Sequence, residues 1–74
     1  MNEKKYLWKV DIVLNSGKEL ECLNESCETD SVKVAEEIFG NKEDTSVVGL
    51  LDATMSKNVF VFVREVASFA IYVP

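Results

Sequence analysis

The 74-residue chain contains no histidine, only one proline and only two cysteines. Histidine is the side chain that most often acts as a general base near neutral pH, so its absence removes the commonest catalytic machinery. None of the six serines has an evident activating partner in the sequence. We therefore expect no catalytic residue and predict that the protein is not an enzyme.

The residues that commonly bind metals or phosphates are equally scarce. A structural zinc ion normally takes four Cys or His ligands, and only Cys22 and Cys27 are present. These two could form a disulfide that closes a very small loop, but we expect reduced thiols in a reducing cytoplasm. Gly17 and Gly40 stand singly, so no phosphate-binding loop is indicated. The sequence predicts no metal and no cofactor.

Long apolar segments are also missing. A transmembrane helix needs about 20 mainly apolar residues, and Arg64-Glu65 interrupts the longest apolar run. The basic opening, residues 1–5, is followed by Lys9 and Asp11 and not by an uninterrupted signal core. We expect a single domain over residues 1–74, no membrane contact and a cytoplasmic location. A chain this short buries roughly 60% of its unfolded surface, so oligomerisation often supplements its core.

Acidic residues are concentrated in the middle of the chain. The net charge is −5, yet residues 19–44 alone carry −7 and the remainder +2. Binding to DNA or RNA requires cations that replace phosphate counterions, so direct nucleic-acid binding is disfavoured. An acidic surface suits a basic protein partner, although it also serves solubility alone. The candidate partner-binding residues are Glu19, Glu21, Glu25, Glu28, Asp30, Glu36, Glu37, Glu43 and Asp44.

Apolar residues are concentrated at the end of the chain, where twelve of the fifteen residues 59–73 are apolar. A half-buried strand alternates apolar and polar residues, because successive side chains point to opposite faces. Here both faces require cover from a helix, a barrel closure or another subunit. Valines and phenylalanines alternate in residues 59–63, and the pattern leaves open which set points outward. We expect a homo-oligomer, with an isologous interface formed by Phe60, Phe62 and Phe69.

Periodicity and turn residues predict one helix and five strands. Tyr6, Trp8, Val10, Ile12 and Leu14 share one face of the first strand, which makes Trp8 a core candidate. The turn 15–17 contains Gly17, which tolerates the positive φ of a short hairpin. The predicted elements are strands at 6–14, 18–23, 45–52, 58–63 and 67–73, a loop at 24–30, and a short helix that Asp30 or Ser31 caps and Gly40 and Asn41 end.

The order ββαβββ predicts an α+β fold with one short helix packed on the sheet. Five short strands, one of them apolar on both faces, favour a strongly curved antiparallel sheet or a small barrel of the SH3/Sm-like type. Gly49 marks either a bulge or a close backbone approach. We expect Cys22 to pack as a small core residue. The helix residues expected to rest on the sheet are Val32, Val34, Ala35, Ile38 and Phe39.

Two resemblances add to this interpretation. The strand, one-turn break and strand around Arg64-Glu65-Val66 are similar to the end of SH3-like and Sm-like barrels. The whole chain resembles small phage and prophage proteins of Gram-positive bacteria, with its lysine-flanked first strand, Ser16-Gly17-Lys18 hairpin, acidic short helix and apolar final strands. This resemblance implies an accessory protein in the host cell, an inhibitor of a host enzyme or defence system.

Our leading hypothesis is a non-catalytic inhibitor whose acidic surface occupies a basic site on a host protein, for example a nucleic-acid-binding one, by electrostatic mimicry. The alternative is a homo-oligomeric barrel that binds a small ligand, such as a signalling nucleotide, between its subunits. That ligand would require Lys9, Lys57 and Arg64 to converge on phosphate. A structural assembly protein is a third possibility.

Overall fold

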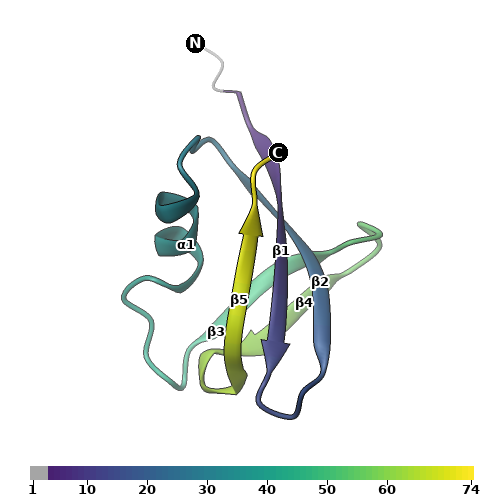
Figure 1. Ribbon diagram of the computed structural model, residues 1–74, viewed down its shortest axis with the longest axis vertical. Coiled ribbons are helices and arrows are strands. Elements are labelled where there is room, and N and C mark those ends of the chain that lie inside the picture. The colour runs from purple at the N-terminus through teal and green to yellow at the C-terminus, as the bar shows by residue number, and fades with distance from the viewer. Residues whose placement is uncertain (1–3) are drawn as a thin grey trace.

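The computed structural model describes residues 4–74. Residues 1–3 lie outside the described part. They make up most of the segment 1–5 that precedes the first strand. The structure is α+β, with one helix and a five-stranded antiparallel sheet, as expected (Figure 1). The elements are β1 (Tyr6–Leu14), β2 (Glu19–Ser26), α1 (Ser31–Phe39), β3 (Val47–Asp52), β4 (Asn58–Phe62), the 3-10 turn η1 (Val63–Glu65) and β5 (Val66–Tyr72).

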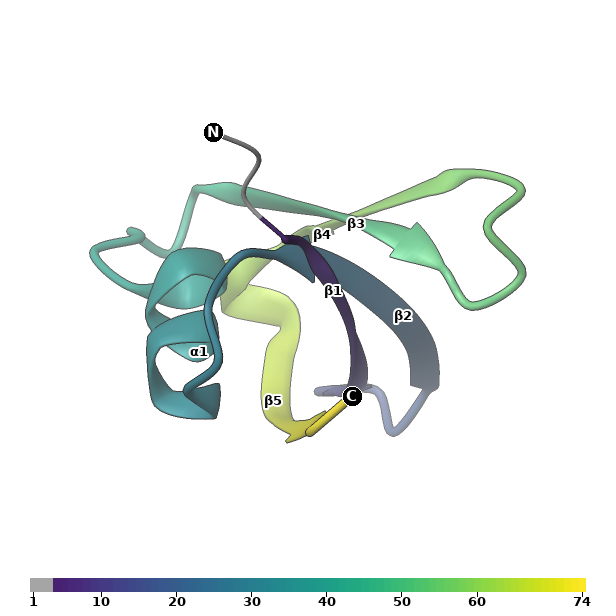
Figure 2. The same ribbon diagram turned by 90° about the horizontal axis from the view of Figure 1, so that it is seen from above.

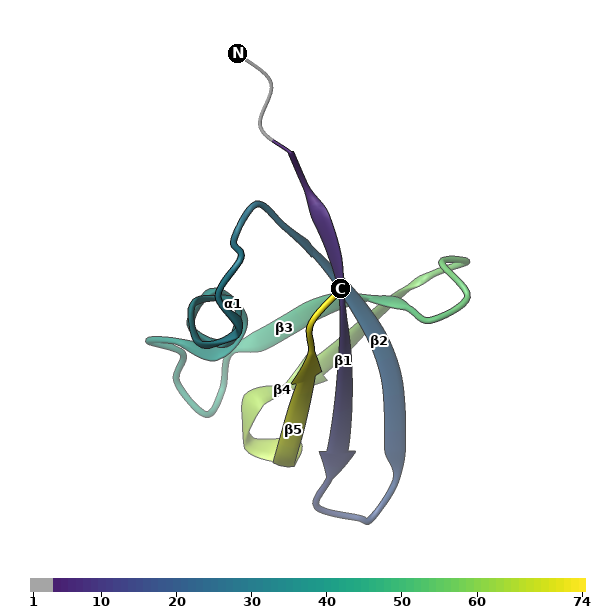
Figure 3. The same ribbon diagram turned by 45° about the horizontal axis from the view of Figure 1, so that its top comes forward.

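The strands lie in the order β4-β3-β2-β1-β5, so β4 and β5 are the two edges of the sheet. Closing a barrel requires the two edge strands to pair, and no ladder joins β4 to β5 within residues 4–74. The expected barrel is therefore not formed. The sheet is nevertheless curved, since the β3–β4 hairpin crosses the direction of β1 and β2 (Figures 2 and 3). The ladder between β2 and β3 contains only two residue pairs. The strand direction of the sheet changes at this short ladder.

The β1–β2 hairpin follows the predicted turn chemistry. Gly17 has φ +90°, a conformation that favours glycine. Strand β2 is longer than the predicted 18–23, because backbone pairing continues to Ser26, which lies opposite Tyr6. The ladder depends on backbone groups, so the polar side chains of residues 24–26 do not stop it. The predicted loop 24–30 is correspondingly shorter.

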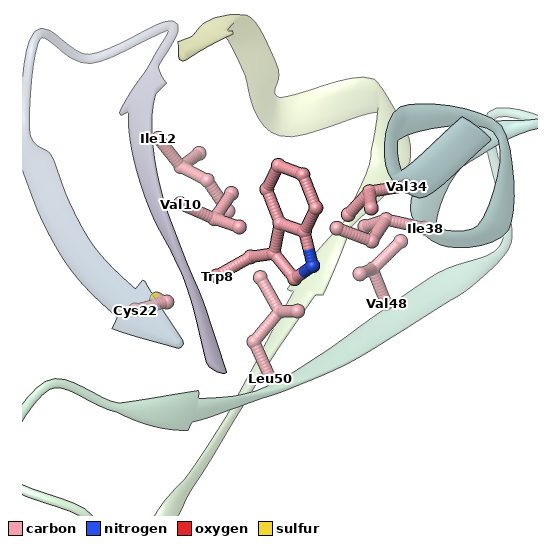
Figure 4. Packing of buried hydrophobic residues seen from close by; sticks show 8 residues of the cluster. All are labelled: Trp8, Val10, Ile12, Cys22, Val34, Ile38, Val48 and Leu50. Carbon is pink, nitrogen blue, oxygen red and sulfur yellow. The ribbon is translucent and has the colours of Figure 1, made fainter. Parts of the chain in front are cut away.

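The core lies between the sheet and α1, with Trp8 at its centre (Figure 4). Trp8 is 1% exposed and Cys22 is fully buried, which confirms both as core residues. Val61 is buried on β4, whereas Phe60 and Phe62 are exposed, so the valine face of residues 59–63 points inward. The other buried apolar residues are Val10, Ile12, Val34, Ile38, Val48 and Leu50.

Helix α1 begins as predicted, because the Asp30 side chain accepts a hydrogen bond from the backbone N–H of Val32 at 2.9 Å. Val34 and Ile38 form its buried stripe. The expectation that Val32 also rests on the sheet is wrong, since its side chain is 62% exposed. At 3.6 residues per turn, Val32 lies about 140° around the helix from the centre of that stripe.

The ends of the remaining strands lie within two residues of the predicted positions. The sequence offered Gly40 and Asn41 as the residues that end α1 with a positive φ. Gly40 has φ −63°, and Asn41 is the one of the two that adopts a positive φ, of 56°. Gly49 pairs regularly with Phe60 in the β3–β4 ladder, which carries no bulge. The group that closely approaches the Gly49 backbone is the Phe60 ring. Within residues 4–74, no helix is long and apolar enough to cross a lipid bilayer.

Candidate acidic binding surface

The nine acids of residues 19–44 lie on two sides of the molecule. Strand β2 and helix α1 flank β1 on opposite sides in Figures 1 and 2, and each carries part of the set. The structure therefore does not gather the predicted partner-binding residues into one patch. The strand group is Glu19, Glu21 and Glu25, the helix group is Glu36, Glu37, Glu43 and Asp44, and Glu28 and Asp30 lie in the connection between them.

The strand group lies on the outer face of the β1–β2 hairpin. Glu19, Glu21 and Glu25 occupy odd-numbered positions of β2 and are all exposed, since alternate residues of a strand share a face. Asp11 of β1 lies directly opposite Glu21 in the ladder. Asp11, Glu19 and Glu21 line a hollow of about 310 Å³ together with Ile12, Val13 and Leu20. We call this concavity the hairpin hollow.

Asp11 is the residue that gives the hairpin hollow its chemistry. One of its carboxylate oxygens, Oδ1, is buried and has no hydrogen-bond partner within residues 4–74. Its neighbour across the ladder, Glu21, is also acidic, and like charges directly opposite each other in a sheet are destabilising. Within residues 4–74, the hollow thus holds two carboxylates without an ion pair, those of Asp11 and Glu19, and one of them has an unsatisfied acceptor oxygen.

Two lysines partly offset the strand group. Lys9 Nζ lies 3.7 Å from Glu21 Oε1 and 5.3 Å from the centroid of the Tyr72 ring. Lys5 Nζ lies 3.6 Å from Glu25 Oε1. Both ion pairs are largely exposed to solvent, where such pairs contribute little free energy. In the described part of the chain, neither Asp11 nor Glu19 has a cation within ion-pair distance.

In the helix group and the connection before it, two acids have structural partners. Glu37 Oε2 accepts a hydrogen bond from Ser26 Oγ at 2.8 Å, and the Asp30 side chain caps α1. Glu36, Glu43 and Asp44 are exposed. Lys33 and Lys42 stand in the same stretch of sequence as the helix group. The hairpin hollow, in contrast, has its carboxylates aligned on one face of one ladder.

Cys22 is not placed to act as a nucleophile. No disulfide joins Cys22 and Cys27. Burial raises the pKa of the Cys22 thiol, and the negative charges of Asp52 and Asp11 raise it further. A raised pKa keeps the thiol protonated, and the thiolate is the reactive form. Within residues 4–74, no three His, Cys, Asp or Glu side chains are placed to hold a metal ion.

The predicted oligomer residues lie on both faces of the sheet. Phe60 and Phe62 point outward from β4 and are 69% and 45% exposed. Phe69 of β5 lies opposite Ile12 and stacks on Phe39 of α1, with ring centroids 4.3 Å apart. Phe69 therefore packs against the helix, apart from the two β4 aromatics.

The cations that a bound nucleotide would need are spread over the fold. Lys9 lies on β1, Lys57 precedes β4, and Arg64 follows β4 with its guanidinium 5.0 Å from the Phe62 ring centroid. At about 3.3 Å per residue, a strand of this length holds Lys57 and Arg64 roughly 20 Å apart. They do not converge within one copy of the chain.

Sequence reasoning missed Asp11, because only the acid-rich segment 19–44 was considered. A local signal was available. The turn at residues 15–17 makes Leu14 and Lys18 the first hydrogen-bonded residues of the hairpin. Counting back from this pair along both strands places Asp11 opposite Glu21.

The chain's own residues are the basis for a functional assignment. Comparison with protein-family models, curated proteins and solved structures finds no match to this chain. The resemblance to phage proteins accordingly stays an expectation from the sequence. The hairpin hollow and the two edge strands are the features from which a function can be inferred.

Proposed function

We propose that this protein is a non-catalytic binding module whose hairpin hollow receives basic side chains of a partner protein. One observation carries the proposal: Asp11 and Glu21 face each other across the ladder, and Asp11 Oδ1 is buried without a hydrogen-bond donor from residues 4–74. Leaving a buried acceptor unsatisfied costs about 1–3 kcal/mol. A fold retains such an arrangement more readily when a ligand supplies the missing donor and the missing positive charge.

An arginine or lysine of the partner supplies the positive charge, and it supplies the donor once the Asp11 carboxylate rotates to turn Oδ1 toward the hollow. Guanidinium and ammonium groups donate charge-assisted hydrogen bonds to carboxylates, and these are roughly twice as strong as neutral ones. Glu19 lies beside the Asp11–Glu21 pair and is exposed, so it is available for a second contact. The net charge of −5 attracts a basic partner over distances of about 10 Å at moderate salt and accelerates association.

The biological role that follows is that of an accessory inhibitor in the host cytoplasm. A host protein that binds nucleic acid exposes a basic surface to phosphates, and an acidic module can occupy that surface in their place. The resemblance to phage and prophage proteins supports this part of the proposal. Direct contact with nucleic acid or a membrane is not part of it.

The proposal is tested by capturing the partner from host lysate and measuring its affinity for purified variants. Glu19→Gln/Glu21→Gln removes two charges from the hairpin hollow, and we expect it to weaken binding at least about tenfold, since hydrogen bonds to charged groups contribute about 1.5–3 kcal/mol each. Glu36→Gln/Glu43→Gln makes the same change in net charge on the helix side and should retain affinity. Equal loss in both variants would contradict the assigned surface.

Salt provides a second measurement. Binding through solvated charges weakens as ionic strength rises from about 0.05 to 0.5 M, because the Debye length shortens. We expect a slower association rate at high salt, with a smaller effect on dissociation. An association rate that is independent of salt would exclude electrostatic mimicry.

The alternative, a homo-oligomer that binds a small ligand or builds an assembly, has one supporting observation. Phe60 and Phe62 are exposed on an edge strand, as an oligomer interface requires. A nucleotide retained through purification, together with an oligomeric mass, would favour ligand binding. An oligomer that purifies without a ligand would favour the assembly protein.

A further inference from the structure

The outward edge of β4 is unprotected against strand addition. Strand β4 pairs with β3 on one side, and within residues 4–74 no strand pairs with its other side. Natural sheets usually block such edges with charged residues, proline, bulges or covering segments. The five residues of β4, Asn58–Phe62, include no charged residue and no proline. Its unpaired backbone N–H and C=O groups are therefore available to a further strand.

An apolar hollow of about 320 Å³ runs along this edge. One wall is β4 itself, with the inward valines Val59 and Val61, and the other is the end of the β1–β2 hairpin, with Leu14 and Leu20. The charged residues Lys18 and Glu65 also line the hollow. A strand that adds to β4 would direct its inward side chains into this space.

The opposite face of β4 carries the exposed aromatics. The Phe60 ring lies against Gly49 of β3, so closely that a Cβ atom at position 49 would be 2.9 Å from Phe60 Cε1. Val47 lies opposite Phe62 in the ladder and is 48% exposed. Large side chains thus cover the outer face of the β3–β4 hairpin, and exposed apolar patches of this kind mark interaction sites.

We propose that β4 pairs with β4 of a second copy of this chain, antiparallel about a two-fold axis, to form one continuous ten-stranded sheet across the dimer. The occupant is inferred from complementarity, because β4 carries valines on one face and phenylalanines on the other. Antiparallel pairing centred on Phe60 places Val59 opposite Val61 of the second copy, with both valines directed toward the hollow. Phe60 then lies opposite Phe60 of the second copy.

This register also keeps each face of the sheet uniform. A slip of one residue would set valine against phenylalanine and direct aromatic rings into the hollow, so the side-chain alternation excludes it. The interface is isologous and closes at two copies. Lys57 and Arg64 fall at the two ends of the paired strands, at the solvated rim. Each chain has a net charge of −5, and two copies therefore repel each other. The acids of residues 19–44 lie on elements other than β4, so the repulsion is weaker at this edge.

Mass measurement by light scattering across a concentration series tests the dimer. We expect a concentration-dependent shift from one to two copies, with backbone amides of β4 gaining protection from hydrogen exchange in the dimer. Phe60→Lys inserts a charge into the middle of the edge at a position that is 69% exposed, so the monomer should stay folded while the dimer is lost. Val32→Lys introduces the same charge on α1 at a 62% exposed position and should leave the dimer intact.

A cross-link tests the register. In a Cys27→Ser background, Phe60→Cys places two thiols opposite each other across the axis, where Cα atoms of paired strands are about 4.5–5.5 Å apart and a disulfide can form. We expect rapid oxidation to a covalent dimer, and no such dimer from Val73→Cys. A chain that stays monomeric at high concentration, a Phe60→Lys variant that still dimerises, or a closed ring of three or more copies would each overturn the proposal.

Discussion

Ser26 Oγ donates a 2.8 Å hydrogen bond to Glu37 Oε2 and so connects the last residue of β2 to the last turn of α1. The same hydroxyl oxygen accepts a hydrogen bond from the backbone N–H of Glu28 at 3.1 Å. Ser26 is 5% exposed, and it orders the segment that carries the chain from the sheet to the helix. Glu37, which the sequence suggested as a partner contact, thus has a structural role.

Ser26→Ala should therefore destabilise the fold. It removes the hydroxyl that bonds Glu37 and leaves the Glu28 N–H without its acceptor, and we expect a loss of about 1–3 kcal/mol in the free energy of unfolding. Urea denaturation measures the effect. Ser68→Ala, at an exposed position on β5, is the matched control and should change the unfolding free energy by less than about 0.5 kcal/mol.

The cap of α1 gives a second prediction. Asp30→Ala removes the acceptor for the Val32 N–H and should lower the free energy of unfolding by about 1 kcal/mol. Asp30→Asn keeps an acceptor oxygen while it removes the charge, so it should be nearly neutral. Thermal unfolding monitored by circular dichroism distinguishes the two. If both variants lost the same stability, the charge and not the hydrogen bond would be responsible.

The two glycines 40 and 49 should respond differently to alanine. A Cβ at Gly40 would collide with the backbone oxygen of Glu36, which cannot move without distorting the helix end. A Cβ at Gly49 would meet only the exposed Phe60 ring, which can rotate away. We expect Gly40→Ala to cost about 1–3 kcal/mol and Gly49→Ala clearly less, as measured by chemical denaturation. The reverse order would contradict the packing described here.

Cys22 should make stability depend on pH in the alkaline range. Its folded-state pKa is raised, first by burial and then by Asp52 and Asp11, so the unfolded chain ionises at lower pH than the folded one. Above the unfolded pKa, the unfolded state binds fewer protons, and stability falls as pH rises. We expect a lower melting temperature at pH 10 than at about pH 8, with a smaller drop in Cys22→Ala. The native Cys22 thiol should also react slowly with a thiol reagent.

Much of the fold follows from local signals in the sequence. The alternation in residues 6–14 predicts a strand with Trp8 inside, and Gly17 predicts the tight turn that follows. Asp30 predicts the start of α1, which has the residue at its N-cap. Arg64 and Glu65 predict the one-turn break that η1 makes between β4 and β5. Each signal works because a few neighbouring residues decide the backbone conformation.

The errors arise where distant segments decide the outcome. Residues 24–26 are polar, yet they belong to β2, because β1 offers them backbone partners. Val32 belongs to the apolar arc that the sequence predicts for the helix. The residues of α1 that are buried are Val34 and Ile38, and Val32 lies outside that stripe. Asp11 stands outside the acidic segment in sequence and inside the candidate site in space.

For residues 59–73, the sequence alone established that valines and phenylalanines of the first half lie on opposite faces, because side chains of a strand alternate. It also established that an interruption follows at Arg64. Only the tertiary structure decided that Val61 is buried and that Phe60 and Phe62 face solvent. The same structure leaves β4 and β5 as open edges, because strand pairing is a long-range property. The exposure of Phe60 and Phe62 on the edge strand β4 makes this part of the apolar segment a candidate interface.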